Sequence, residues 1–77
     1  MDHLVTQMKW RLNEGDGECF YQIGVSDNGF LHGLSNEDMT TSLNTLKVMA
    51  AQLSASTSVL KRKILSNGRS CCEVLVQ

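Results

Sequence analysis

The sequence predicts an α+β fold, a two-layer αββαββ sandwich in which two helices cover one face of a four-stranded, mainly antiparallel sheet. Two segments place apolar residues at helical spacing, and the segments after each of them alternate apolar and polar residues. Asn-Gly pairs stand at the two points where hairpins would turn. This order equals that of a ferredoxin-like domain with its first strand moved to the end, which would leave the final strand between two neighbours.

Length and composition favour one small folded domain over residues 1–77. The chain is 42% hydrophobic and 19% charged, and it contains no proline. Its formal net charge is -1, so long-range attraction to nucleic acid is weak, although a local basic patch is compatible with this value. The N-terminus has no signal-peptide pattern and the apolar runs are too short to span a bilayer. We therefore expect a soluble cytoplasmic protein with no membrane contact.

The first helix is expected over about residues 2–13. Leu4, Val5, Met8 and Leu12 fall at helical spacing, with Trp10 on the flank of that stripe. The stretch NEGDGE that follows lacks the alternating oxygen ligands of a calcium loop. It predicts the end of the helix and a turn.

A hairpin is expected next, with strands over 18–26 and 30–34. Alternation along the first strand predicts two faces. The inward face carries Cys19, Tyr21, Ile23 and Val25, and the outward face carries Phe20, Gln22 and Gly24.

Two registers are compatible with the turn of this hairpin. A two-residue Asn28-Gly29 loop of type I′ pairs Asp27 with Phe30 and buries more apolar surface, so it is favoured. A three-residue loop over 27–29 pairs Ser26 with Phe30 instead. That register would bring Phe30 and His32 to the face of Phe20 and would favour RNA binding by base stacking.

The second helix is the clearest signal in the chain and is expected from residue 36 to about Leu53. Ser35 is the predicted N-cap, with Asp38 three residues later completing a capping box. An apolar stripe at spacings of four, three, four and three predicts the core-facing side; its members are Met39, Leu43, Leu46, Ala50 and Leu53.

The last hairpin is expected to join a strand over 59–65 to a strand over 70–77 through Asn67-Gly68. Cys72, Val74 and Val76 are the residues predicted to face the core from the final strand.

Enzyme signatures are absent from the sequence. No G-x-x-x-x-G-K-[ST] phosphate loop is present, and GDGE has neither its lysine nor its spacing. Cys19, Cys71 and Cys72 do not form a disulfide framework and are expected to be reduced thiols. Together with His3 and His32 they show no metal-ligand spacing. A nucleophilic cysteine activated by His32 is the weaker hypothesis, and an ordinary sheet histidine is favoured.

The candidate interaction surface consists of cations and one aromatic residue. On a strand, Lys61 and Lys63 share a face and Arg62 points to the other, with Arg69 across the turn. One interpretation is a solvated edge strand that lysines protect against aggregation. The other is a phosphate-contacting RNA surface that also uses Phe20.

Several stretches resemble the region just before the GTPase domain in the GTP-binding protein 1/2 family. They are MKWRLNEGDGE, YQIGVSDNG, GLSNEDM and SLNTLKVMA, and the ending EVLVQ is similar to the strand that precedes that domain. The resemblance runs from about Met8 to Leu60. In contrast, KRKILSNGRSCC looks shorter than the usual connection of the family.

The resemblance implies an accessory domain N-terminal to a GTPase domain that is not included in this chain. Family members are translation-type GTPases related to elongation factors, which implies a role in ribosome rescue and translation surveillance. Expected partners are the downstream GTPase domain, the ribosome or a release-factor-like rescue protein. GTP and magnesium would bind the parent GTPase domain, so this chain itself is expected to hold no cofactor and to catalyse no reaction. The alternative is a small independent RNA-binding module.

Overall fold

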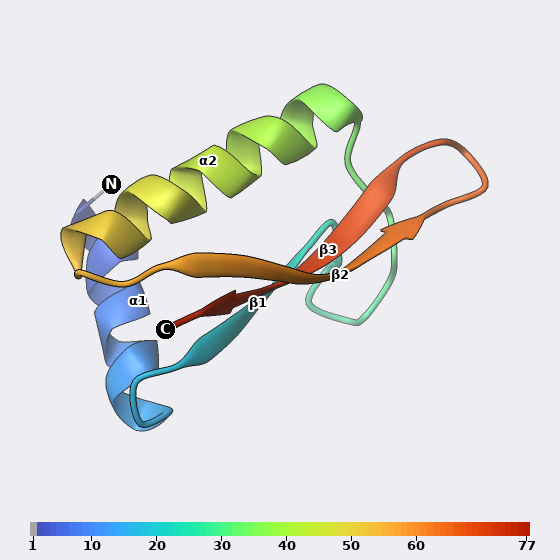
Figure 1. Ribbon diagram of the computed structural model, residues 1–77. Helices are drawn as coiled ribbons and strands as arrows, with labels where there is room; N and C mark the ends of the chain where they lie inside the picture. The colour runs from blue at the N-terminus through green and yellow to red at the C-terminus, as the bar shows by residue number, and fades with distance from the viewer. Residues whose placement is uncertain (1) are drawn as a thin grey trace.

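The computed structural model describes residues 2–77, which form two helices and three strands. The elements are α1 (Asp2–Glu14), β1 (Cys19–Ile23), α2 (Asn36–Gln52), β2 (Thr57–Ile64) and β3 (Ser70–Val76). The strands form one antiparallel sheet in the order β1-β3-β2, and Figure 1 shows α2 running along this sheet with α1 beside one end of it. The α+β class with two helices is therefore confirmed, but the described sheet has three strands instead of the predicted four.

α1 is held against the sheet by both apolar and cationic contacts. Met8 is fully buried, whereas Trp10 lies on the exposed flank of the helix. The guanidinium of Arg11 lies 4.2 Å from the centroid of the Tyr21 ring, a cation–π contact. Arg11 also donates a hydrogen bond to the main-chain carbonyl of Phe20. These contacts place α1 at the β1 side of the sheet.

α2 begins and ends where the sequence predicts. Ser35 has extended backbone angles (φ −62°, ψ 163°), and its hydroxyl accepts a hydrogen bond of 3.2 Å from the N–H of Asp38. The helix ends with Leu53 as its C-cap. Its buried residues are Met39, Leu46, Met49 and Ala50, and Leu43 and Leu53 are partly buried against the core. The predicted stripe is therefore confirmed, and Met49 is an addition to it.

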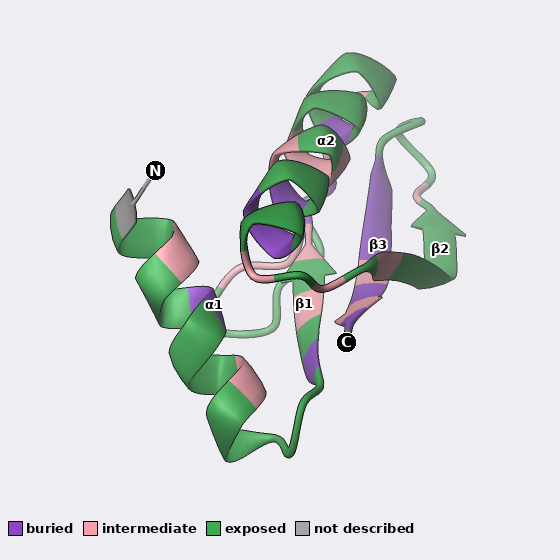
Figure 2. Cartoon of the chain, turned by 60° about the vertical axis from the view of Figure 1, so that its left-hand side comes forward, coloured by how far each residue is buried: buried purple, intermediate pink, exposed green. Residues whose placement is uncertain are grey.

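β3 is the central strand and carries the sheet side of the core. The register pairs Cys19 with Val76 and Tyr21 with Val74 on one side, and Val59 with Val74 on the other. The final strand is therefore central, as predicted, but its two neighbours are β1 and β2, and the strand over residues 30–34 that a ferredoxin-like order would place beside it is not formed. Figure 2 shows buried residues along β3 and on α2, and these residues belong to one core cluster. The core comprises Met8, Cys19, Met39, Leu46, Met49, Ala50, Cys72, Val74 and Val76.

The predicted strand over residues 30–34 is wrong. The chain leaves β1 at Gly24 and returns at Gly33, whose N–H donates to the carbonyl of Gly24 (2.9 Å). Both glycines have positive φ, 85° and 74°, which turns the intervening hairpin away from the line of β1. Leu34 then exchanges two main-chain hydrogen bonds with Ser70 and forms only an isolated bridge. The ferredoxin-like order is therefore not formed.

The favoured register of this hairpin, with Asp27 opposite Phe30, is also wrong. Val25 pairs with Leu31, and the N–H of Ser26 donates to the carbonyl of Phe30 at 3.0 Å. This is the register with a three-residue loop over 27–29.

The asparagine side chains explain why the longer loop forms. Asn28 does not take the positive φ that a type I′ turn requires, whereas Gly29 has a φ of 86°. The Asn28 Oδ1 instead accepts a hydrogen bond from the N–H of Phe30 (3.1 Å). The hairpin between β2 and β3 repeats this arrangement, since Asn67 Oδ1 accepts from the N–H of Arg69 at 3.0 Å.

Candidate interaction surface

The predicted surface residues divide between the two faces of the sheet. Lys61 stands opposite Glu73 in the ladder and Lys63 stands opposite Cys71, on the face away from the helices. Arg62 lies on the other face, where its guanidinium donates a hydrogen bond of 3.2 Å to the side-chain oxygen of Asn36. The predicted alternation of the three cations is therefore confirmed.

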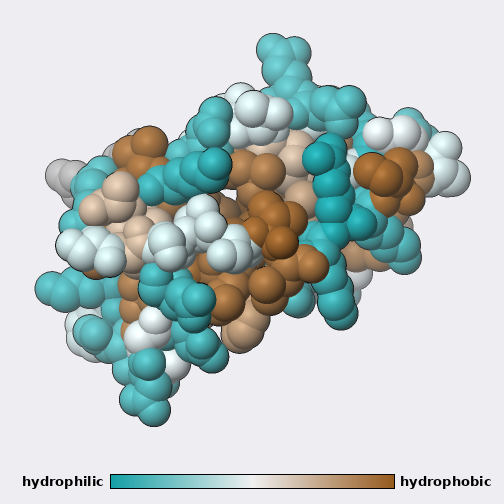
Figure 3. All heavy atoms as spheres, viewed as in Figure 1, coloured by the Kyte–Doolittle hydropathy of each residue, from teal (hydrophilic) through white to brown (hydrophobic). Residues whose placement is uncertain are grey.

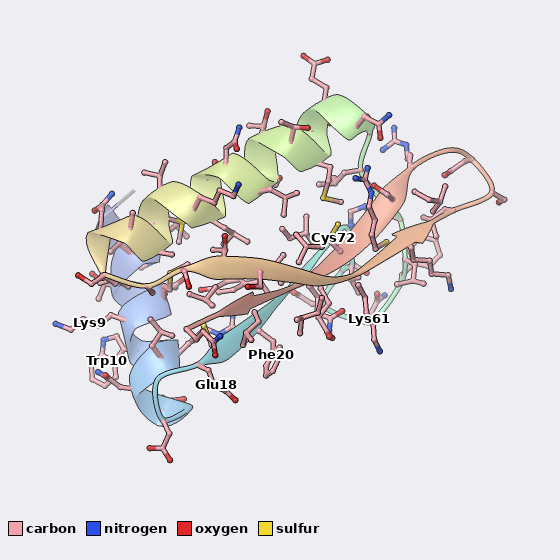
Figure 4. All side chains as sticks on the ribbon, viewed as in Figure 1. Lys9, Trp10, Glu18, Phe20, Lys61 and Cys72 are labelled. Atoms are coloured by element: carbon pink, nitrogen blue, oxygen red, sulfur yellow. The ribbon has the colours of Figure 1, made fainter. Side chains whose placement is uncertain are left out.

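Phe20 also lies on the outer face, but at the opposite edge of the sheet. Figure 4 shows Phe20 and Lys61 on the side of the sheet away from α2, with Phe20 on β1. Between their strands, the Glu73 carboxylate on β3 accepts a hydrogen bond of 2.9 Å from Gln22. Arg69 is separate from this group, because it lies at the end of the turn between β2 and β3. The five predicted residues consequently do not form one continuous patch.

The observed hairpin register does not bring more aromatic residues to the outer face. A shallow groove of about 160 Å³ lies where the hairpin approaches the sheet, and the hairpin side chains that line it are Val25 and Leu31. Phe30 remains 67% exposed, and the Nδ1 of His32 lies 3.1 Å from the carbonyl oxygen of Gly33. The aromatic platform that this register was expected to create is therefore not formed. The hairpin turns out of the line of β1 at Gly24, and the side chains that it directs to the groove on the outer face are Val25 and Leu31, not Phe30 and His32.

The cysteines are buried structural thiols. Cys71 donates a hydrogen bond to the carbonyl of Gly24 (3.3 Å), and Cys19 and Cys72 lie in the core. Burial raises the pKa of the Cys19 thiol, partly offset by the charge of Arg11, and a raised pKa lowers the thiolate fraction that nucleophilic attack requires. Within residues 2–77, no group of three or more His, Cys, Asp or Glu side chains could hold a metal ion.

The outer edge of β2, which was predicted to be either a lysine-protected edge or an RNA-contacting surface, also exposes apolar residues. β2 is the terminal strand of the sheet, and no other strand pairs with its outer side among the described residues. Val59 is 51% exposed, and Leu60 and Ile64 are also exposed. Figure 3 shows apolar atoms gathered below α2 along this strand, with hydrophilic side chains beside them.

A groove follows this edge on the helix side. It has a volume of about 390 Å³ and lies between α2 and β2. Leu43, Val59 and Val74 provide its apolar lining, and Lys47 contributes a cation. The sequence feature that could have indicated this edge is the pair Val59-Leu60, which stands immediately before the three cations. Because β2 is exposed along most of its length, burial in the core does not account for two adjacent apolar residues there.

Fold and surface together define a small α+β module with one buried core and an unpaired sheet edge. Neither of its helices, over the described part of the chain, is long and apolar enough to cross a membrane. No protein-family model and no solved structure matches the chain.

Comparison with curated proteins shows which known sequences this chain is similar to. The chain is 51% identical over 80 residues to GTP-binding protein 2 of Mus musculus and of Homo sapiens, an alignment that covers 99% of this chain. GTP-binding protein 1 of Xenopus laevis is 35% identical over 68 residues, or 88% of this chain. The resemblance to GTP-binding proteins 1 and 2 is thus confirmed. The chain spans only 13% of the length of the first two relatives and 10% of the third, so it corresponds to a small region of a GTP-binding protein.

Proposed function

We propose that this chain is a non-catalytic accessory domain of an elongation-factor-like GTPase, located N-terminal to the GTPase domain. It acts in ribosome rescue and translation surveillance by docking a protein partner or the ribosome. The observation that carries this proposal is the 51% identity over 99% of the chain to a segment making up 13% of GTP-binding protein 2.

The chemistry of the chain supports a docking role over a catalytic one. Its sequence contains no phosphate loop that could hold the nucleotide of the parent protein. Its thiols are buried in the core or bonded to the main chain. Its exposed features are an apolar and cationic sheet edge and the outer face of the sheet, which are surfaces suited to contact with a macromolecule.

Deletion from a full-length relative tests the accessory role. Mouse GTP-binding protein 2 would be compared with a variant that lacks the segment matching this chain. We expect the variant to bind and hydrolyse GTP within about twofold of the intact protein and to sediment less with ribosomes or with its protein partner. Loss of GTP binding would show that the segment is an integral part of the GTPase, and unchanged sedimentation would refute docking.

RNA binding is the second candidate function, supported by one observation. Phe20, Lys61 and Lys63 share the outer face of the sheet, where an aromatic ring can stack on a base and lysines can contact phosphates. Such binding would weaken steeply with added salt, and Phe20→Ala would reduce it. An affinity for RNA that is insensitive to both changes would exclude this function.

A further inference from the structure

We propose that the outer edge of β2 binds an extended peptide segment by strand addition, and that this segment carries acidic residues followed by apolar ones. This inference deepens the docking function proposed above by naming the surface and the chemistry of the partner. Strand addition uses the unpaired main-chain groups of an edge strand for affinity and neighbouring side chains for specificity.

The main-chain groups of β2 are directed outward at defined residues. Ser70 exchanges both of its main-chain hydrogen bonds with Leu34, so its partner across the other ladder, Ile64, directs its N–H and C=O away from β3. Alternation along an antiparallel ladder gives Arg62 the same outward orientation. These two residues therefore offer donors and acceptors to an added strand.

The other edge of the sheet is less accessible. α1 flanks β1, and Arg11 already bonds the main-chain carbonyl of Phe20. Beyond Ile23 the chain turns at Gly24 into the hairpin. Among the described residues no other strand pairs with the outer edge of β2, and Figure 2 shows this strand at the margin of the molecule.

The positive charges on β2 indicate which kind of segment would bind at its outer edge. Lys63 stands opposite Cys71 and Arg62 stands opposite Cys72, so neither cation has an acidic residue across the ladder. A second copy of the chain pairing edge to edge would place these cations near their own counterparts, which is unfavourable. A segment with acidic residues at this position would instead pair with Lys63 and Arg62, whereas Lys61 already stands opposite Glu73.

The half of β2 around Val59 indicates that the partner segment also carries apolar residues. A register shift between Val59 and Lys61 separates the cationic half of β2 from the half beside the groove. There, Leu43 and Val59 line the space of about 390 Å³ next to α2, into which a strand added at this edge would direct an apolar side chain. In the antiparallel direction, the acidic residues of the partner precede its apolar residues.

A synthetic peptide of about eight residues tests the proposal, with the sequence Thr-Glu-Glu-Glu-Thr-Val-Thr-Val. We expect it to bind the 77-residue chain, and the same peptide with Lys in place of Glu to bind at least about tenfold more weakly. Hydrogen exchange at saturating peptide should slow at the amides of Arg62 and Ile64. No binding, or exchange that slows at other amides only, would overturn the proposal.

Two matched variants separate the edge from general charge effects. Lys63→Glu should weaken the acidic peptide about tenfold, whereas Lys9→Glu on α1 makes the same charge change far from the edge and should alter binding by less than about twofold. Figure 4 shows Lys9 at the far end of the molecule from Lys61. Equal effects of the two variants would overturn a specific edge site.

Methylation of the peptide main chain tests strand addition itself. N-methyl groups on alternate residues block the hydrogen bonds of one edge of an extended peptide. Of two peptides methylated at odd or at even positions, the one methylated on the edge that faces β2 should not bind, and the other should bind as before. Equal behaviour of both peptides would refute the proposal. The proposal would also be refuted by a dimer of the chain in which the amides of Arg62 and Ile64 are protected from exchange without peptide. A single-stranded RNA that binds more tightly than the acidic peptide, and whose binding depends on Phe20, would refute it as well. These peptide experiments use the chain alone, so their failure is distinct from failure of the GTPase deletion experiment.

Discussion

Leu46→Ala tests the assignment of the core face of α2. Leu46 is 7% exposed and belongs to the core cluster that joins both helices to β3. Removing a buried leucine side chain down to alanine costs about 2–5 kcal/mol. An open groove of about 410 Å³ borders Leu46, so neighbouring groups and water can enter part of the space. We therefore expect the lower part of that range, about 2–3 kcal/mol.

Such a loss is large for a chain of this size. Stabilities of about 0.05–0.15 kcal/mol per residue give about 4–12 kcal/mol for 77 residues. Guanidinium titration followed by circular dichroism gives the free energy of unfolding, and the slope m should not change.

Val48→Ala is the matched control on the same helix. Val48 is 49% exposed, so its truncation loses little buried area, and alanine is the better helix former. The two terms nearly cancel, and we expect a change within about 0.5 kcal/mol. A loss below about 1 kcal/mol for Leu46→Ala, or an equal loss for both variants, would show that the assigned helix face is wrong.

Three further predictions concern the cap, the hairpin and the thiol. Ser35→Ala should cost about 1 kcal/mol in a denaturant titration, because the first turn of α2 loses a hydrogen-bond acceptor. Gly24→Ala should cost about 2–3 kcal/mol, since φ is 85° and a Cβ would lie 2.9 Å from the carbonyl oxygen of Ser70. Gly17→Ala, with φ 92° and open space around it, should cost less, and equal losses would contradict the close approach. Burial raises the pKa of Cys19, so the unfolded chain ionises first and stability should fall as the pH rises above the ordinary value of 9.0. Denaturation midpoints between pH 7 and pH 10 check this, and a Cys19→Ser variant with the same pH profile would refute the assignment.

Local signals explain which parts of the fold the sequence predicts well. The cap at Ser35 and the apolar stripe of α2 depend on residues three and four positions apart, and these interactions form within one helix. Likewise the alternation of Cys72, Val74 and Val76 directs them to the core whichever strand lies beside them. Local periodicity was sufficient for these elements.

The missing strand depends on information that periodicity does not contain. Residues 30–34 alternate acceptably for a strand, yet the positive φ values of Gly24 and Gly33 turn the chain out of line. Leu34 then occupies the position beside Ser70 at which a longer β1 would have continued. Glycine permits this path but does not require it, so the sequence alone could not distinguish a continued strand from an excursion.

The direction from which a ligand approaches determines which of the three cations on β2 it can contact. A ligand lying flat on the outer face reaches Lys61 and Lys63, but Arg62 lies on the opposite face and is bonded to Asn36. A segment lying along the edge of β2, in the plane of the sheet, is adjacent to all three side chains at once. The lysines that would protect this edge from pairing with a second copy are therefore the same residues that would select an acidic strand. Protection and recognition are compatible at one edge because they concern partners of opposite charge.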